Sequence, residues 1–303
     1  MENIQPKYGR VVLVGRPNTG KSTLLNALMN QKVAITSPLP QTTRKSSQVV
    51  FSDPRGKIVF TDTPGIINKV EDLMSRTINS ETPKEVGRKD IVLCLVDISR
   101  PKSDEENKVI GLVRKQPCKK ILIYNKIDKA VGSKDHLADY NYLEEEFDKV
   151  ISVSAIRSTN IKGLLNIIFD LLPDNPDKEL VKSIEEMAKT GGPLIGMHAK
   201  EYVEELIREK AYLFLREEIP YTVKVEVEEI VDKRKLIYIK ATIYTNADRY
   251  KKMIIGKDGK KIKEIGFNAR KELELMSSRK VFLELEVKTN THWMENDYNL
   301  LTG

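Results

Sequence analysis

Short apolar runs alternate with helical stretches through the first 173 residues, and this alternation most restricts the folds open to the chain. The runs are nearly continuous in Val, Ile and Leu, as strands are when helices cover both faces of a sheet. They fall at residues 11–15, 49–51, 57–60, 91–97, 119–126 and 150–155. We therefore expect a doubly wound α/β domain in which the hairpin at 49–60 forms an antiparallel edge.

The pattern changes after a helix expected at about 161–172. Pro173 and Pro176 stop that helix, and from about residue 199 the order becomes helix, strand, strand, helix, helix, strand. Strict alternation in VKVEVEEI and FLELEVK predicts a sheet with one wet face. We expect three segments, which are a nucleotide-binding domain at 1–173, a linker at 174–198, and a smaller α+β domain with a C-terminal tail at 199–303.

The stretch GRPNTGKS at 15–22 follows an expected strand and opens an expected helix. Gly15 and Gly20 allow the backbone to curl until its N–H groups point at phosphate oxygens. Lys21 would lie against the outer phosphates, and the Ser22 hydroxyl can bind Mg²⁺. The predicted nucleotide contacts here are Gly15, Arg16, Pro17, Asn18, Thr19, Gly20, Lys21, Ser22 and Thr23.

The stretch NKID at 125–128 predicts which base is bound. The Asp128 carboxylate can accept two hydrogen bonds from the ring N–H and amine of guanine, a donor pair that adenine lacks. Asn125 would brace the loops and the Lys126 stem would cover the base, while the backbone at Ser154-Ala155 would meet guanine O6. The predicted base-side contacts are Asn125, Lys126, Ile127, Asp128, Ser154 and Ala155.

The stretch DTPGI at 62–66 predicts a sensor of the terminal phosphate. Asp62 would hold Mg²⁺ through water, and the Gly65 N–H would meet the γ-phosphate. A second metal-binding hydroxyl would come from the loop at 36–48, with Thr43 the first choice and Thr42 the second. Ile66 is apolar where many phosphate-cleaving switches have a polar side chain that aims a water. The predicted contacts here are Asp62, Thr63, Pro64, Gly65 and Ile66, and no general base is assigned.

The stretch IIGKDGK in the second half places a GxxG turn between two expected helices. Residues 249–263 hold seven basic side chains against one acid, Asp258, which is typical of a nucleic-acid contact. The predicted RNA contacts are Ile255, Gly256, Lys257, Asp258, Gly259, Lys260, Lys261 and Lys263. Four isoleucines could line an adjoining groove or pack in the core, and these are Ile254, Ile255, Ile262 and Ile265. For Trp293 we favour covering the domain edge over stacking on a base.

Together these motifs resemble the Era-like subfamily of the translation-factor-related GTPases. The resemblance covers nearly the whole chain and includes GRPNTGKSTLLN, QTTR, DTPGI, NKID, SA, LIREKAYLFLREEIPYTVKVEVEEI, KATIY, IIGKDGKKIKEIG and ARKEL. It implies a P-loop GTPase domain with a mixed sheet, followed by a type II KH domain. It also implies slow GTP hydrolysis, binding of 16S rRNA near its 3′ end, and a role in assembly of the small (30S) ribosomal subunit.

The resemblance also bears on cofactors and on Ile66. Members of this group place an apolar residue after the sensor glycine and hydrolyse GTP without a glutamine there. Related potassium-activated GTPases use an asparagine at the position of Asn18 to hold K⁺ against the phosphates, so K⁺ joins Mg²⁺ as a candidate cofactor. The chain departs from the family pattern at 66–90, which is shorter, and at 188–198.

Composition points to no particular partner, and two other functions are weighed against the GTPase interpretation. The net charge of +7 is too unevenly distributed to identify a partner, and Cys94 and Cys118 lack the spacing of a zinc site. No apolar run approaches the ~20 residues of a membrane span, so we expect a soluble, cytoplasmic protein. We also expect it to be a monomer. A signalling GTPase coupled to the cell cycle or to the inner face of the cell membrane stays an alternative. A small-molecule kinase is disfavoured because it needs no guanine clamp.

Overall fold

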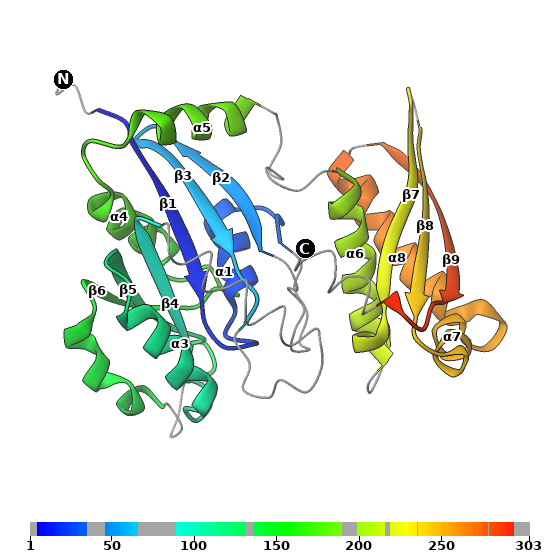
Figure 1. Cartoon of the computed structure of the whole chain (residues 1–303), viewed down its shortest axis with the longest axis horizontal. Helices are drawn as coiled ribbons and strands as arrows, with labels where there is room; N and C mark the ends of the chain where they lie inside the picture. The colour runs from blue at the N-terminus through cyan, green and yellow to red at the C-terminus, as the bar shows by residue number, and fades with distance from the viewer. Residues whose placement is uncertain are drawn as a thin grey trace. The chain divides into compact units, whose positions relative to one another are not determined.

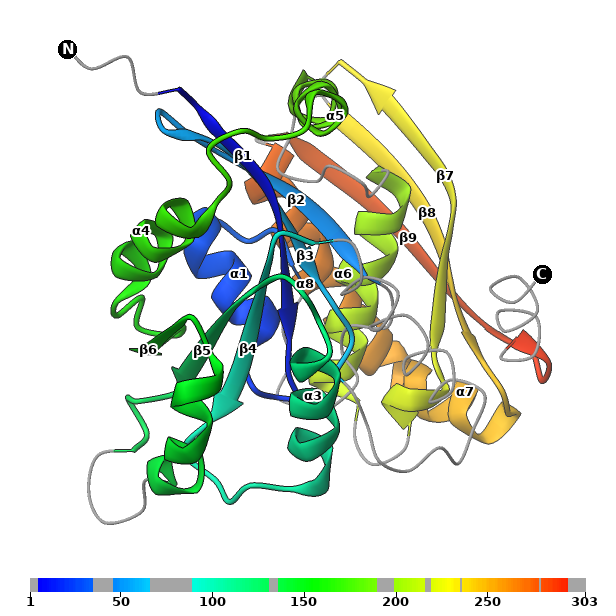
Figure 2. The same cartoon turned by 60° about the vertical axis from the view of Figure 1, so that its left-hand side comes forward.

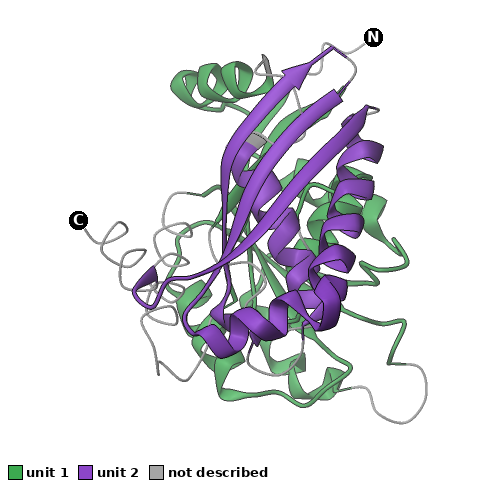
Figure 3. Ribbon diagram, turned by 90° about the vertical axis from the view of Figure 1, so that its right-hand side faces the viewer, with its two compact units in different colours: residues 1–36, 43–196 green, residues 37–42, 197–303 purple. Residues whose placement is uncertain are grey.

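The computed structural model describes residues 5–34, 46–65, 89–130, 136–189, 199–215, 219–234, 236–277 and 279–293. The described residues up to 189 form one compact unit, and those from 199 onward form a second (Figure 3).

A six-stranded sheet forms the centre of the first unit (Figure 1). Its strand order is β2-β3-β1-β4-β5-β6, and β2 runs antiparallel to β3 while the other neighbours are parallel. The strands are β1 (Lys7–Val14), β2 (Ser47–Asp53), β3 (Gly56–Asp62), β4 (Ile91–Asp97), β5 (Lys119–Asn125) and β6 (Lys149–Val153). The predicted doubly wound sheet with an antiparallel hairpin at its edge is confirmed.

Helices cover both faces of this sheet (Figure 2). Alternate residues of β1 explain why, since Val11 and Leu13 belong to one apolar core and Val12 and Val14 belong to the other. The first core includes side chains of α1 (Lys21–Met29) and α4 (Ile161–Leu171), and the second includes α3 (Asp104–Arg114) and the short helix η2 (Asn141–Glu146). A further short helix, η1 (Leu137–Asp139), lies beside η2. Every residue of β4 is buried, as expected of a central strand.

Part of the segment that the sequence predicts to be a linker, 174–198, is helical. Helix α5 (Lys178–Lys189) packs Leu180 and Ile184 against apolar side chains of β2 and β3. Its Glu185 carboxylate accepts a hydrogen bond of 2.7 Å from the Tyr8 hydroxyl. The helix therefore belongs to the first unit, because burial of its apolar side adds to that core.

The second unit is a three-stranded sheet with helices on one face (Figure 3). Strands β7 and β8 are antiparallel, β8 and β9 are parallel, and α6 and α8 pack against β7 and β9. Its elements are α6 (Ala199–Phe214), η3 (Ile219–Thr222), β7 (Lys224–Lys233), β8 (Leu236–Thr245), α7 (Asp248–Ile255), η4 (Lys257–Gly259), α8 (Lys260–Ser277) and β9 (Lys280–Thr289). The predicted order of elements is confirmed.

Three predictions for individual side chains of this unit have clear outcomes. Trp293 is 1 % exposed and its indole N–H donates to the Thr222 carbonyl at 3.1 Å, which confirms that it covers the domain edge. Ile254 and Ile265 are fully buried and therefore pack in the core rather than line a groove. Ile255 and Ile262 are only partly buried.

Candidate functional site

The loop from Gly15 to Ser22 connects the end of β1 to the start of α1, where ligands bind in doubly wound sheets. Gly20 has φ 96°, and a Cβ there would lie 2.4 Å from Asn125 Nδ2. A Cβ on Gly15 would lie 2.7 Å from the Leu95 carbonyl oxygen. Both glycines are therefore required by the backbone path and by the neighbouring strands.

Lys21 lies beneath this loop. Its ammonium donates to the carbonyls of Gly15 and Arg16, at 3.0 and 3.1 Å. Burial lowers the pKa of Lys21 to about 8, while the nearby Asp62 carboxylate acts in the opposite direction. Phosphate oxygens bound at this loop would add negative charge and so favour the charged ammonium.

Two cations and one carboxylate hold the outer peptides of the loop. Arg100 donates to the Pro17 carbonyl at 2.7 Å, and Lys126 donates to the Asn18 carbonyl at 2.5 Å. Both cations contact Asp97 Oδ2, at 2.9 and 2.7 Å. Since a trans peptide directs its N–H opposite to its carbonyl, this arrangement turns the N–H groups of Asn18 and Thr19 toward the other side of the loop.

Sequence reasoning missed Asp97 and Arg100. Asp97 is 1 % exposed; burial alone would raise its pKa, but hydrogen bonds from Lys126 and Ser99 hold the pKa below its usual value. The available signal was a carboxylate at the end of the apolar run IVLCLVD, because polar residues at the carboxyl ends of parallel strands face the ligand site.

The side chain of Arg16 is directed to α3. Its Nε pairs with Glu106 Oε1 at 2.8 Å, both side chains are almost fully buried, and its guanidinium also donates to the Pro101 carbonyl at 3.1 Å. Any contact between Arg16 and a nucleotide would therefore come from its main chain. Glu106 is a third residue that sequence reasoning did not identify.

The predicted guanine-side residues are brought together at the ends of β5 and β6. Asn125 Nδ2 donates to the Thr19 carbonyl at 2.7 Å, and Asn125 Oδ1 accepts from the Ala155 N–H at 3.1 Å. The Ser154 hydroxyl donates to Asp128 Oδ1 at 2.6 Å. Asn125 thus links the phosphate loop to the Ser154-Ala155 turn, which is the bracing role predicted for it.

The predicted magnesium residues meet where β3 ends. The Ser22 hydroxyl donates to Asp62 Oδ2 at 2.5 Å, and Asp62 is 1 % exposed. A hydroxyl and a carboxylate beside a phosphate loop are the oxygen donors that Mg²⁺ uses with nucleotides, so these residues fit the ion. Thr43, its alternative Thr42 and Ile66 lie outside the described residues.

The sensor turn lies directly against the phosphate loop. A Cβ on Gly65 would be 2.6 Å from the Pro17 nitrogen, and the Thr63 hydroxyl donates to the Leu13 carbonyl at 2.7 Å. Pro17, whose carbonyl Arg100 holds, is thus also close to Gly65.

The GxxG turn of the second unit lies at the surface and contains three residues with positive φ. Gly256 and Gly259 both have φ 72°, Asp258 has φ 55°, and a Cβ on Gly256 would lie 2.7 Å from Lys261 Cβ. The side chains of Lys257 and Asp258 are exposed. The turn therefore lies at the surface, with both glycines partly exposed, and glycine is needed for its shape.

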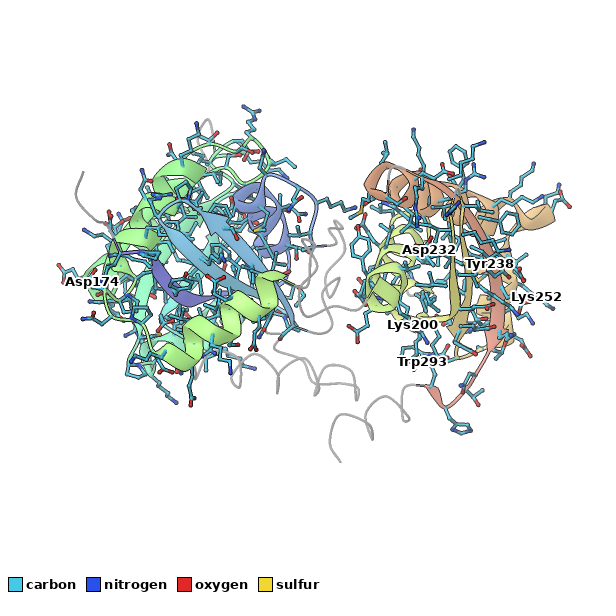
Figure 4. The ribbon with its side chains drawn as sticks, turned by 90° about the horizontal axis from the view of Figure 1, so that it is seen from above. Asp174, Lys200, Asp232, Tyr238, Lys252 and Trp293 are labelled. Carbon is cyan, nitrogen blue, oxygen red and sulfur yellow. The ribbon has the colours of Figure 1, made fainter. Side chains whose placement is uncertain are left out.

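Basic side chains surround this turn on both helices. Lys252 points outward from α7 (Figure 4). The exposed cations of the segment are Arg249, Lys252, Lys257, Lys260 and Lys263, and Lys251 and Lys261 are partly buried.

Among the helices of the described residues, none combines the length and apolar composition of a membrane span.

Two family models match the chain. Residues 10–126 match the model described as 50S ribosome-binding GTPase, and residues 218–294 match that of the KH domain. The first match contains the phosphate loop, the sensor turn and the start of the guanine motif. The second contains the GxxG turn and the whole three-stranded sheet.

Curated relatives match over almost the full length. GTPase Era of Halothermothrix orenii is 38 % identical over 300 residues, which cover 96 % of each chain. GTPase Era of Thermotoga maritima is 36 % identical over 299 residues, covering 97 % of this chain and 96 % of the relative.

Two solved structures are also similar over almost the full length. One is the crystal structure of Era in complex with MgGDPNP and nucleotides 1506–1542 of 16S ribosomal RNA, with a TM-score of 0.87, 31 % identity and 99 % of each chain covered. The other is an Aquifex aeolicus Era variant bound to GDP·AlF4⁻, with a TM-score of 0.86, 31 % identity, and coverage of 98 % of this chain and 99 % of that one.

Proposed function

Since the chain belongs to the Era family of GTPases, we propose that it binds 16S rRNA near its 3′ end through its KH domain and assists assembly of the 30S subunit as a GTP-hydrolysing switch. The observation that carries the RNA part is the GxxG turn, which is exposed, requires glycine at Gly256 and is surrounded by cations. In KH domains such a turn clamps the backbone of about four nucleotides. The RNA of the similar Era complex, nucleotides 1506–1542, is much longer than that.

The hydrolytic site would act mainly by positioning and by charge. Lys21 and the loop N–H groups would bind the phosphates, and the contacts of Arg100 and Lys126 would fix the direction of those N–H groups beforehand. The Gly65 N–H would contact the γ-phosphate, so its position would report hydrolysis. Ser22 and Asp62 would hold Mg²⁺, which supplies positive charge beside the phosphates.

A potassium requirement is a finer part of the proposal. Asn18 has φ 64° in the part of the loop that the two cations hold. We expect GTP turnover to be faster in K⁺ than in Na⁺, and the difference to disappear in Asn18→Ala. Equal rates of the unchanged protein in the two salts would contradict a role for K⁺.

The RNA proposal is tested by measuring the affinity for RNA with the sequence of the 16S 3′ end. Gly256→Asp should weaken this binding strongly, because it adds a Cβ 2.7 Å from Lys261 and a negative charge at the turn. Gly111→Asp adds the same charge where a Cβ meets nothing within 4 Å, and it should leave the affinity unchanged. An affinity indifferent to both RNA sequence and Gly256→Asp would contradict the proposal.

The cations of the GxxG turn would also attract an anionic membrane surface. Peripheral membrane association is therefore tested by sedimentation with anionic vesicles, and binding that persists in Gly256→Asp but disappears with salt would favour this alternative partner. We expect the protein to be a monomer, which light scattering would measure.

A further inference from the structure

We propose that the solvent-facing side of α8 is a second RNA contact surface, continuous with the GxxG turn and centred on Phe267. This proposal rests on the RNA-binding function proposed above and names the surface that extends it. The α8 surface consists of Lys260, Lys263, Phe267, Arg270 and Lys271.

The spacing of these residues places them on one side of the helix. Lys260, Lys263, Phe267 and Arg270 follow one another at intervals of three or four residues, and Lys271 lies four residues after Phe267. Together they span about 16 Å along the axis. The opposite side of α8 is anchored in the core, where Ile265, Ala269 and Leu273 are buried. The orientation of the helix is therefore fixed, and the α8 surface faces solvent.

Phe267 is the apolar centre of this surface and is 55 % exposed. The guanidinium of Arg270 lies 5.6 Å from the ring centroid, and Lys263 and Lys271 lie one turn away on either side. An exposed ring flanked by cations suits a nucleic-acid base, because the base stacks on the ring while its phosphates meet the positive charges.

By helical spacing, two carboxylates of α8, Glu264 and Glu274, lie on or beside the α8 surface, and the third, Glu272, faces α6. Each of its three carboxylates contacts a partner within the second unit. Glu264 pairs with Lys261 at 3.3 Å, Glu272 pairs with Lys210 at 2.5 Å, and Glu274 Oε1 accepts the Val281 N–H at 3.1 Å.

The lysines of the α8 surface have no such neutralisation. Among the residues that the structure describes, Lys260, Lys263 and Lys271 have no carboxylate within 4 Å. The surface therefore has an excess of positive charge that continues the cation cluster of the GxxG turn, and a polyanion is the partner that complements it.

The occupant is RNA that adjoins the nucleotides held at the turn. The GxxG backbone accounts for about four nucleotides, so a longer bound strand needs further contacts. The α8 surface begins at Lys260, directly after the turn, and can receive the neighbouring unpaired nucleotides with one base on Phe267.

The second unit contains a matched control for Phe267. Phe282 on β9 is also 55 % exposed, but its ring stacks on Tyr238 with centroids 5.9 Å apart and an interplanar angle of 13°. The Tyr238 hydroxyl in turn donates to Glu284 at 2.7 Å. Phe282 is thus a phenylalanine with the same exposure as Phe267, but a carboxylate lies near it instead of a row of cations.

The experiment measures the affinity of the full chain for two RNAs by fluorescence anisotropy. One RNA is a short 16S 3′-end segment that fills only the GxxG site, and the other is extended at both ends. Phe267→Ala should weaken binding of the extended RNA by about 10-fold and leave the short RNA unchanged. Phe282→Ala should leave both affinities within about 2-fold.

A charge variant tests the same surface independently of the aromatic ring. Lys271→Gln should reduce the salt dependence of extended-RNA binding by about 0.7 in the slope of log K against log salt. Lys233→Gln combined with Lys280→Gln removes two exposed charges elsewhere in the unit and should leave the slope unchanged.

The outcomes separate this inference from the proposed function. Failure of the unchanged protein to bind either RNA would overturn the proposed function, and the α8 surface with it. The α8 surface alone would be overturned if the unchanged protein binds both RNAs normally and Phe267→Ala changes neither affinity or changes both equally. An effect of Phe267→Ala no larger than that of Phe282→Ala would have the same meaning.

Discussion

The phosphate loop at 15–22 and the GxxG turn at 256–259 both use glycine to bring a backbone near phosphates, but they are supported in opposite ways. The first is held by side chains at or just after the ends of β4 and β5, which are Arg100, Asn125 and Lys126. The second lies between its own two helices, with exposed lysines around it. A braced loop can bind phosphates through N–H groups of fixed direction. An exposed turn depends for its affinity on nearby positive charge and on contacts with the adjoining surface.

Gly20→Ala should have the largest effect on ligand affinity, because it disrupts the braced loop. A Cβ would lie 2.4 Å from Asn125 Nδ2 at φ 96°, so the residue that joins the loop to Ser154-Ala155 must move. We expect GDP affinity to fall by on the order of 100-fold, measured with a fluorescent GDP analogue. Gly111→Ala, where a Cβ meets nothing within 4 Å, is the control. Unchanged affinity in Gly20→Ala would show that the loop is not braced in this way.

Gly256→Ala tests the exposed turn. A Cβ would lie 2.7 Å from Lys261 Cβ at φ 72°, so we expect RNA affinity to fall by about 30-fold while GDP affinity stays unchanged. Gly259→Ala is a graded control, because it has the same φ but its nearest neighbour is 3.9 Å away, and its effect should be smaller. Equal losses in the two variants would mean that backbone strain alone, and not the contact with Lys261, sets the shape of the turn.

Arg100→Met tests the bracing contacts that the sequence did not reveal. Losing the bond to the Pro17 carbonyl loosens Pro17, which also lies close to Gly65, so turnover should fall by about 10-fold with little change in GDP affinity. Arg100→Lys should restore part of the rate. Arg114→Met, which removes an exposed pair with Glu146, should leave turnover unchanged. Equal effects of the two Met variants would argue against a positioning role for Arg100.

The pH dependence of nucleotide binding should show the smallest effect. Burial lowers the pKa of Lys21 to about 8, and bound phosphate would raise it, so binding takes up a proton above that pH. GDP affinity should therefore be highest below pH 8 and fall about 4-fold between pH 7 and 8.5. Calorimetry in buffers of different ionisation enthalpy measures the proton uptake. Absence of uptake at pH 8.5 would contradict the burial of Lys21 as the cause.

The sequence identified the motif residues that the structure gathers around the phosphate loop, but it missed several residues that hold the loop in place. The glycine-containing phosphate loop, DTPG, NKID and SA become specific when they occur in this order along the chain. Asp97, Arg100 and Glu106 are common residue types, and their roles arise only because the sheet order places β4 between β1 and β5. Helix α5 was not recognised as part of the first unit for a similar reason, because its apolar side chains become part of a core only where they pack against β2 and β3.

We expect the nucleotide held by the braced loop to control the RNA bound by the GxxG turn, as the proposed GTP-hydrolysing switch requires. The most direct test of this coupling is the affinity of the full chain for 30S subunits, or for the 16S 3′-end RNA, with GDP and with a non-hydrolysable GTP analogue. We predict that the two affinities differ by about 5-fold or more, which is within the usual range of coupling between sites. Equal affinities in the two nucleotide states would contradict the account.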